Sequence, residues 1–398
     1  MEKSRKPKIR FKGYNDDWEQ RKVGDFLTES RIRGNTGLDA KKLTVKLWGK
    51  GVVEKNDFGG SEHTQYFTRR KGQFIYSKLD FLNSAFGVIP EKLDNYESTA
   101  DLPAFDLDGM NPYFMYFVAI QESFYLKHGS IADGSRKAKR IHADTFLNMP
   151  VMVPTIDEQN LIVDFVQHLD NIITLHQRKL DKLVNVKKSM LEKMFPKQGS
   201  TVPEVRFSGF TEDWEQRKVG ELLIERNQQA PMSEEYPLMA FVANEGVTPK
   251  GERYDRSALV TDTKNKLYKK TEFGDFIYSS NNLETGSIGL NKYGKACISP
   301  VYSIFKPIDI ADSDFLGRRL VRKDFINTMV KWRQGVIYGQ WRIHESDFLN
   351  IDILVPVTDE QQRIGKLLDD IDHLITLHQR KLEKLKNIKK SMLEKMFI

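Results

Sequence analysis

The chain has 398 residues, of which 39% are hydrophobic and 29% are charged, and its 62 Lys and Arg exceed its 55 Asp and Glu to give a net charge of +7. This balance is typical of a globular protein and argues against collagen-like, disordered and membrane-embedded classes. No stretch approaches the ~18 consecutive apolar residues that a membrane span needs, and the basic N-terminus lacks the apolar region of a secretory signal. The only cysteine, Cys297, cannot form an internal disulfide, so we expect a cytoplasmic protein. The positive charge permits a polyanionic partner such as nucleic acid.

The first predicted element is a leader segment that the chain contains twice. Residues 7–27 return as residues 203–223, and Trp18 returns as Trp214, 196 residues later. Both copies read Asp-Trp-Glu-Gln-Arg-Lys-Val-Gly around that tryptophan. Because a repeat of this kind indicates duplicated architecture, we predict that the chain consists of two related halves.

A long body follows each leader, and the two bodies differ strongly in sequence. Short β-branched and aromatic runs such as Phe-Ile-Tyr at 74–76 mix with helix-like stretches at 110–125 and 312–333, which predicts α+β domains. The clearest similarity inside the bodies is the segment 72–77, which returns as 274–279. A constant frame with two different bodies favours two recognition surfaces, because a duplicated enzyme would keep its catalytic residues in both copies.

Each body ends in a second repeated block that leads into a long predicted helix. Residues 146–159 return as 348–361, and both copies contain Phe-Leu-Asn, Val-Pro and Asp-Glu-Gln in that order. A threonine with an acidic or amide residue three positions later, Thr155 with Glu158 and Thr358 with Gln361, has the spacing of a capping box. Apolar residues then recur at steps of four and three, which predicts a heptad seam. The seam residues are Ile162, Leu169, Ile173, His176, Leu180, Leu183, Ile364, Ile371, Ile375, His378, Leu382 and Leu385.

Two matching seams in one chain most simply bury each other, so we expect the helices to pair antiparallel as a coiled coil. The resulting fold class is two α+β globular domains joined by two long antiparallel α-helices, with an internal pseudo-twofold repeat. His176 and His378 lie near the middle of each seam. We interpret both as structural residues, because two ligands alone make a poor zinc site.

Catalytic signatures are missing from the sequence. Gly246 and Gly251 have P-loop spacing but lack the Lys-Ser/Thr that must follow. Neither 111–113 nor 299–302 completes the Pro-Pro-aromatic motif of an adenine methyltransferase. We therefore expect no catalytic residue and no metal site in this chain.

Basic, amide and aromatic residues gather in the predicted loops of both bodies, and this is the chemistry of phosphate and base-edge contacts. The runs 135–140 and 338–342 carry most weight, because both lie just before the repeated Phe-Leu-Asn. Any one of these residues alone is better interpreted as a solubilising surface residue, so the group carries the prediction. Arg69, Arg70 and Lys71 add further positive charge to the first body. The candidate DNA-binding residues are Lys46, Lys50, Lys78, Ser135, Arg136, Lys137, Lys139 and Arg140 in the first body, and Lys250, Arg253, Asn281, Asn282, Lys292, Lys295, Tyr338, Gln340 and Arg342 in the second.

These features together resemble the specificity subunit of type I restriction–modification systems, the HsdS family. The resemblance spans essentially the whole chain and depends on the doubled leader, the doubled block and the two tails that end in Ser-Met-Leu-Glu-Lys-Met-Phe. The second body also resembles the family's target-recognition domains at 276–279 and 298–302, whereas the first body departs from the second of these motifs. The domains that the resemblance implies are a first target-recognition domain at 1–153, a first spacer helix at 154–196, a second target-recognition domain at 197–355 and a second spacer helix at 356–398.

The resemblance implies a non-catalytic subunit that gives a type I complex its DNA sequence specificity. Each recognition domain would read one half of a bipartite, asymmetric site in double-stranded DNA, and the helices would set the gap between the halves. The frame would dock two methyltransferase subunits and the restriction subunits. S-adenosylmethionine, ATP and Mg²⁺ would bind to those partners, and no cofactor would bind to this chain.

Two other classes stay open. A bivalent scaffold that binds proteins through its two bodies would show no DNA specificity and weak salt dependence. An enzyme fused to its own DNA reader would need a cofactor motif, which the sequence lacks.

Overall fold

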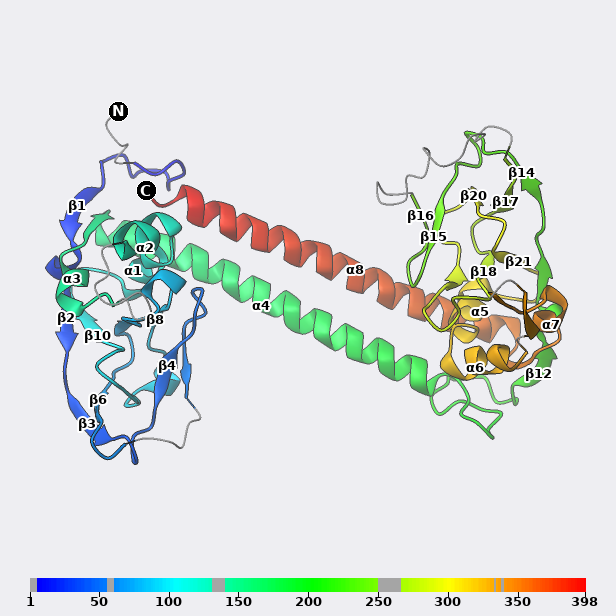
Figure 1. Ribbon diagram of the computed structural model, residues 1–398, viewed down its shortest axis with the longest axis horizontal. Coiled ribbons are helices and arrows are strands. Elements are labelled where there is room, and N and C mark those ends of the chain that lie inside the picture. Colours follow the sequence, from blue (N-terminus) through cyan, green and yellow to red (C-terminus); the bar gives the residue numbers. More distant parts are fainter. Residues whose placement is uncertain (1–5, 56–60, 131–139, 250–265, 333, 338–339) are drawn as a thin grey trace. The chain divides into compact units, whose positions relative to one another are not determined.

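The computed structural model describes residues 6–55, 61–130, 140–249, 266–332, 334–337 and 340–398, with the backbone alone at 334–337 and 340–342. The chain divides into two compact units (Figure 1), Met1–Gln177 with Arg380–Ile398, and Arg178–Gln379. The two long helices are α4 (Ile156–Lys193) and α8 (Thr358–Lys395), and each begins in one unit and ends in the other. Within the described ranges, no helix is long and apolar enough to cross a membrane.

The first unit contains a four-stranded sheet in the order β2-β10-β7-β8, a three-stranded sheet in the order β3-β6-β9, and the strand pairs β1-β11 and β4-β5. Its strands are β1 (Glu19–Lys22), β2 (Leu27–Ser30), β3 (Arg33–Thr36), β4 (Leu43–Val45), β5 (Val52–Glu54), β6 (Gln65–Thr68), β7 (Phe74–Tyr76), β8 (Phe86–Val88), β9 (Glu97–Ser98), β10 (Ala104–Leu107) and β11 (Pro150–Val153). Its short helices are α1 (Pro112–Ala119), α2 (Glu122–Gly129) and α3 (Ala143–Leu147), with 3-10 turns η1 (Val23–Asp25), η2 (Phe81–Asn83) and η3 (Glu91–Leu93).

The second unit repeats the two sheets in the orders β13-β21-β18-β19 and β14-β17-β20 and the two pairs as β12-β24 and β15-β16. Among the described residues, it also contains the pair β22-β23. Its strands are β12 (Glu215–Lys218), β13 (Leu223–Glu225), β14 (Gln229–Ala230), β15 (Ala240–Val242), β16 (Gly246–Thr248), β17 (Tyr268–Thr271), β18 (Phe276–Tyr278), β19 (Ile288–Leu290), β20 (Ala296–Ile298), β21 (Ser303–Pro307), β22 (Gln334–Ile337), β23 (Gln340–Arg342) and β24 (Asp352–Val355). Its short helices are α5 (Ser313–Arg319), α6 (Lys323–Lys331), α7 (Glu345–Leu349) and the 3-10 turn η4 (Val219–Glu221). The predicted α+β class is confirmed, and the first body has the second body's layout although it lacks one of its motifs.

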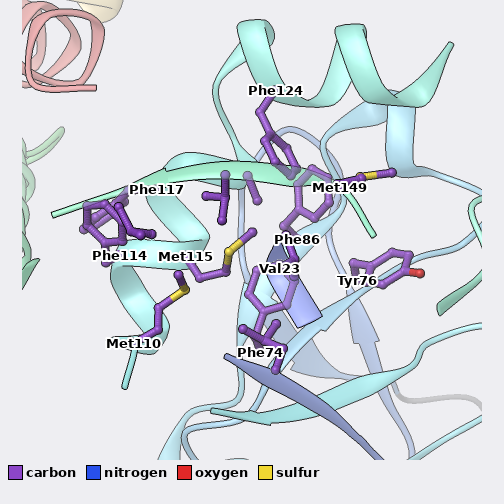
Figure 2. Packing of buried hydrophobic residues seen from close by; sticks show 14 of the residues in the cluster. Val23, Phe74, Tyr76, Phe86, Met110, Phe114, Met115, Phe117, Phe124 and Met149 are labelled. Atoms are coloured by element: carbon purple, nitrogen blue, oxygen red, sulfur yellow. The ribbon is translucent and has the colours of Figure 1, made fainter. Parts of the chain in front are cut away.

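The repeated Phe-Ile-Tyr run is one of the two inner strands of the four-stranded sheet in each unit. All three residues of β7 are buried, as expected for a short apolar run covered on both faces. Figure 2 shows Phe74 and Tyr76 in the core of the first unit, among aromatic and methionine side chains from α1 and α2. Phe146 of the repeated block stacks on Phe74 with ring centroids 5.6 Å apart, and Phe348 stacks on Phe276 at 5.9 Å.

The leader and the block that ends each body form one frame. Strand β1 pairs antiparallel with β11, and β12 pairs in the same register with β24. Arg10 of the leader donates two hydrogen bonds to the buried carboxylate of Glu158, at 2.7 and 2.8 Å. Arg206 and Glu360 repeat this pair at the same distances. The near-identity of these segments therefore has a structural cause, because each contacts another part of the frame.

The predicted capping boxes are wrong. Glu158 is engaged by Arg10. Gln361 donates to Pro356 O at 2.9 Å and accepts from Asp312 N at 3.1 Å. Thr358 is the first residue of α8 and donates to Ile310 O. Residues of the expected types lie at the expected spacing, but their side chains form hydrogen bonds with other residues and not the bonds of a capping box.

The end of one long helix completes the core of each unit. Met396 and Phe397 are buried in the core of the first unit, and Ile9 N donates to Lys395 O at 3.0 Å. Met194 and Phe195 are buried in the core of the second unit in the same way. These methionines are packing residues.

The two helices run antiparallel to each other within each unit. The first half of α4 lies with the second half of α8 in the first unit, and the other two halves lie together in the second. All twelve seam side chains are buried or half-buried. The part of each seam that lies in a unit thus contributes apolar surface to that unit.

Candidate nucleic-acid interface

The first candidate element is the tip of the β4–β5 hairpin, residues 46–51. Lys46 and Lys50 are exposed there. Between them lies Trp48, with 61% of its surface exposed and a left-handed backbone at φ 60°. That conformation is rare for a bulky residue. It costs about 1–3 kcal/mol and persists only where the surrounding structure holds it.

Hydrogen bonds to neighbouring segments hold the hairpin tip in this conformation. Trp48 N donates to Asn83 O at 2.8 Å, and Gly49 N donates to Ser84 O at 2.9 Å, so the tip is bonded to the loop that follows β7. The hydroxyl of Tyr116 on α1 donates to Gly49 O at 2.6 Å. Three hydrogen bonds therefore fix the direction in which the tip presents its side chains.

Two more candidates join the hairpin tip. Lys78 lies in the loop after β7, and its carbonyl accepts from Ile141 N at 3.1 Å. The preceding Arg140 has its Nε 3.5 Å from Asp101 Oδ1. We call residues 46–51, 77–84 and 140–141 the first loop group, which brings four predicted cations together from three segments far apart in the chain.

The second unit builds an equivalent group from different side chains. The β15–β16 hairpin tip has Asn244 in the left-handed region at φ 62°, and Asn244 N donates to Gly286 O at 3.0 Å. The loop after β18 carries Asn281 and Asn282, both exposed. Ile343 N donates to the hydroxyl of Ser280 in that loop at 3.2 Å, whereas in the first unit Ile141 N donates to the backbone carbonyl of Lys78. We call residues 243–246, 279–287 and 342–343 the second loop group.

Lys292 and Lys295 do not join the second loop group. They lie in the loop between β19 and β20, at the opposite end of the β18–β19 hairpin. Lys292 is ion-paired with Asp314 and, at 2.6 Å, with Asp369 of α8. Burial lowers its pKa, but the hydrogen bonds to these carboxylates outweigh that effect and raise it. Lys295 is ion-paired with Glu235.

The expectation that Arg69 adds surface charge is wrong. Its side chain is buried, and it donates to Ser98 Oγ and Ser30 O at 2.8 Å and to Leu102 O at 3.0 Å. Burial lowers its pKa to about 10. Arg70 and Lys71 lie just before β7, at the opposite end of that strand from the first loop group.

The remaining candidates fall outside what the structure describes in full. For Gln340 and Arg342, only the backbone is described, in β23 next to Ile343. The candidates that lie outside the described residues are Ser135, Arg136, Lys137, Lys139, Lys250, Arg253 and Tyr338.

Sequence reasoning missed Trp48 and Asn244. A signal for the first was present, because the Trp-Gly-Lys-Gly run at 48–51 has the composition of a turn and carries an aromatic residue where turns are usually polar. Among the described residues, no group of three or more His, Cys, Asp or Glu side chains could hold a metal ion. The two loop groups offer cations, amides and one indole, which suit phosphates, base edges and base faces.

Comparison with known proteins identifies similar chains. A family model described as the type I restriction modification DNA specificity domain matches this chain twice, over residues 15–185 and 211–387. The MjaVIII specificity subunit of a type I restriction enzyme from Methanocaldococcus jannaschii is 26% identical, over 95% of this chain and 91% of that protein. The putative MjaX specificity subunit from the same organism is 23% identical, over 95% and 92%. The crystal structure of a type I restriction-modification S subunit from M. genitalium has the same fold, with a TM-score of 0.57 at 13% identity over 99% of both chains.

Proposed function

Because this chain belongs to the type I restriction modification DNA specificity family and is the non-catalytic specificity subunit of such a system, we propose that each unit reads one half of a bipartite site in double-stranded DNA. The observation that carries the proposal is the pair of loop groups. They occupy the same place in the same topology, yet one presents Trp48 and four cations and the other presents three asparagines. Two readers with different side chains give an asymmetric target.

The side chains of the two loop groups suit different kinds of DNA contact. Lysines contact phosphates without reading sequence, whereas asparagine pairs in a bidentate way with adenine edges in the major groove. We therefore assign phosphate contacts to Lys46, Lys50 and Lys78, and base reading to Asn281 and Asn282. Arg140 is suited to either role, because Arg also binds guanine edges.

Type I specificity subunits act in a complex with modification and restriction subunits and DNA. We propose that the repeated frame docks two modification subunits, one for each copy of the leader and block. Two identical partners need two nearly identical surfaces, and the frame provides them where the bodies do not. S-adenosylmethionine, ATP and Mg²⁺ then belong to the partner subunits, and the complex works on DNA in the cytoplasm.

We further propose that α4 and α8 set the gap between the half-sites. Each has 38 residues, and a helix of that length extends about 57 Å at 1.5 Å per residue. Matched deletion of one heptad from both helices should shorten the preferred gap. An unchanged gap would contradict a spacer role.

The experiment that tests the proposed function is a genome-wide map of methylated adenine with and without this gene. One bipartite, asymmetric motif should lose its methylation when the gene is deleted. If no motif changes while the modification subunits are present, the DNA-reading function is wrong. The bivalent protein scaffold would then be the better hypothesis.

A further inference from the structure

We propose that Trp48 is a nucleobase-stacking residue, which the first unit inserts into the DNA duplex at its half-site. The inference rests on the proposed function and adds a contact of a different kind, with the face of a base and not with its edge. It also predicts that the first half-site is read partly through DNA deformation, whereas the second is read by amides.

The backbone of Trp48 separates it from an ordinary exposed apolar residue. Single exposed hydrophobic residues are common and need no explanation. Trp48, however, is in a left-handed conformation that glycine adopts far more easily, with Gly49 next to it at φ 61°. Backbone strain of this kind persists where the surrounding structure enforces it, and it clusters at functional sites.

The hydrogen bonds of the hairpin tip enforce this geometry. Bonds to Asn83, Ser84 and Tyr116 fix the backbone on both sides of the indole. A Cβ on Gly49 would meet Ile120 at 3.2 Å, so the tip also packs closely against the unit behind it. The indole is held out from the surface by a rigid support, as an inserted side chain requires.

The charges near Trp48 favour DNA as its partner. Lys46 and Lys50 flank it, and Lys78 lies in the loop to which the tip is bonded. The phosphates on either side of an opened base step would meet these cations. Proteins that insert apolar wedges accept the cost of unstacking for such added contacts.

The repeat argues against a partner protein at this position. A modification subunit that binds both halves needs the same surface twice, but the tip that carries Trp48 in one unit carries Asn244 in the other. Hairpin tips that differ between the two units are those expected to read different half-sites. We therefore place Trp48 on the DNA-reading side of the first unit.

The test uses the full chain in complex with its modification subunits. The probe is a duplex that carries the methylated motif from the genome map, with 2-aminopurine at successive positions of each half-site. The modification subunits flip their target adenines out of the duplex, so 2-aminopurine fluorescence should rise at those positions in any case. Wild-type complex should also raise the fluorescence at one further step, in one half-site only. Trp48→Ala should abolish that rise and weaken binding about 10- to 100-fold, the range expected when one base stack is removed. Trp48→Phe should retain most of the fluorescence rise and most of the binding affinity.

Two further variants separate stacking from folding. Trp48→Gly should raise the melting temperature, because glycine relieves the left-handed strain, and still lose binding as Trp48→Ala does. Leu38→Ala removes another exposed apolar side chain of the first unit and should bind as wild type does.

Three results would overturn the inference. Binding of Trp48→Ala within twofold of wild type, or a wild-type fluorescence rise confined to the target adenines, would reject the inserted indole while leaving DNA reading intact. Loss of discrimination at the other half-site as well would also reject it, because the effect would then be general. If wild-type complex does not distinguish the motif duplex from a scrambled one, the proposed function itself is wrong.

Discussion

Lys389 Nζ of α8 lies 2.6 Å from both carboxylate oxygens of Asp170 on α4. The repeat-related Lys187 lies 2.5 Å from Asp372 Oδ1, so the same ion pair joins the helices once in each unit. A lysine near the end of one helix thus pairs with an aspartate from the first half of the other. Because the pairs fix one axial position of the helices, they complement an apolar seam that several registers could bury.

Charge exchange at this pair should be tolerated, whereas charge repulsion should not. Lys389→Glu should destabilise the first unit by about 1 kcal/mol, a modest value because the side chains are 26% and 44% exposed. Adding Asp170→Lys should recover most of the loss. Urea unfolding of the single and double variants gives the coupling free energy. Lys390→Glu at the more exposed Lys390–Glu394 pair is the matched control, with a smaller expected change. Equal losses at both sites would contradict a specific pair.

The helix ends should stabilise one unit each. Phe397 packs on Trp18 and Phe114, with ring centroids 6.3 and 5.6 Å away. Phe397→Ala should cost the first unit about 3–5 kcal/mol, as for other buried aromatic truncations. Phe195→Ala is the matched variant for the second unit, where Phe195 packs on Trp214 and Phe315. Hydrogen exchange should show faster exchange in a different unit for each variant. Loosening of the second core by Phe397→Ala would contradict the assignment.

The first unit should lose stability as the solution is acidified through the range in which histidine titrates. Burial lowers the pKa of His128, the charge of Lys127 lowers it further, and its ring lies 4.9 Å from that of Phe124. A lowered pKa means that the folded state binds the proton less readily than the unfolded chain does. Stability is therefore present above the ordinary histidine pKa of about 6.5 and falls as pH drops below it. His128→Gln should reduce the fall in melting temperature between pH 7.5 and 5.5. An unchanged fall would exclude His128 as its source.

Amide substitutions should affect a single half-site. Asn281→Ala with Asn282→Ala should relax selection at the half-site read by the second unit, by about 1–3 kcal/mol for each bidentate amide–adenine pair that is removed. Lys292→Met is the control, because Lys292 pairs with carboxylates at the other end of the hairpin. It should reduce stability and leave selection unchanged. Methylation maps of the variants report both effects. A broader motif for Lys292→Met would reassign that end of the unit to DNA.

The features predicted from sequence are those that show in a local residue pattern or in a repeated segment. Helix periodicity predicts α4 and α8, and near-identical segments predict the duplication. The pairing of β1 with β11 was not predicted, because it joins residues more than a hundred positions apart. The capping boxes failed for the same reason, since Arg10 is distant in sequence from Glu158.

The site was predicted less completely than the fold. Sequence alone does not distinguish the buried Arg69 from the exposed Lys46. The identity of a basic residue does not show whether carbonyl oxygens or water molecules surround its side chain. The loop groups depend on bonds such as Ile141 N to Lys78 O, which only the folded sheet creates. Trp48 stands out only when its backbone conformation is known.

The closing of the first core by Met396 and Phe397 sets an order for synthesis. A ribosome makes the two segments of the first unit on either side of the second unit, so Met396 and Phe397 emerge only after every residue of the second unit. Until then, the first unit lacks part of its core, while the end of α4 carries the same Ser-Met-Leu-Glu-Lys-Met-Phe sequence as the end of α8. The end of α4, from the same chain or from a neighbouring copy, can bind to the part of the first core that Met396 and Phe397 will later cover. Crowded expression should therefore produce swapped oligomers.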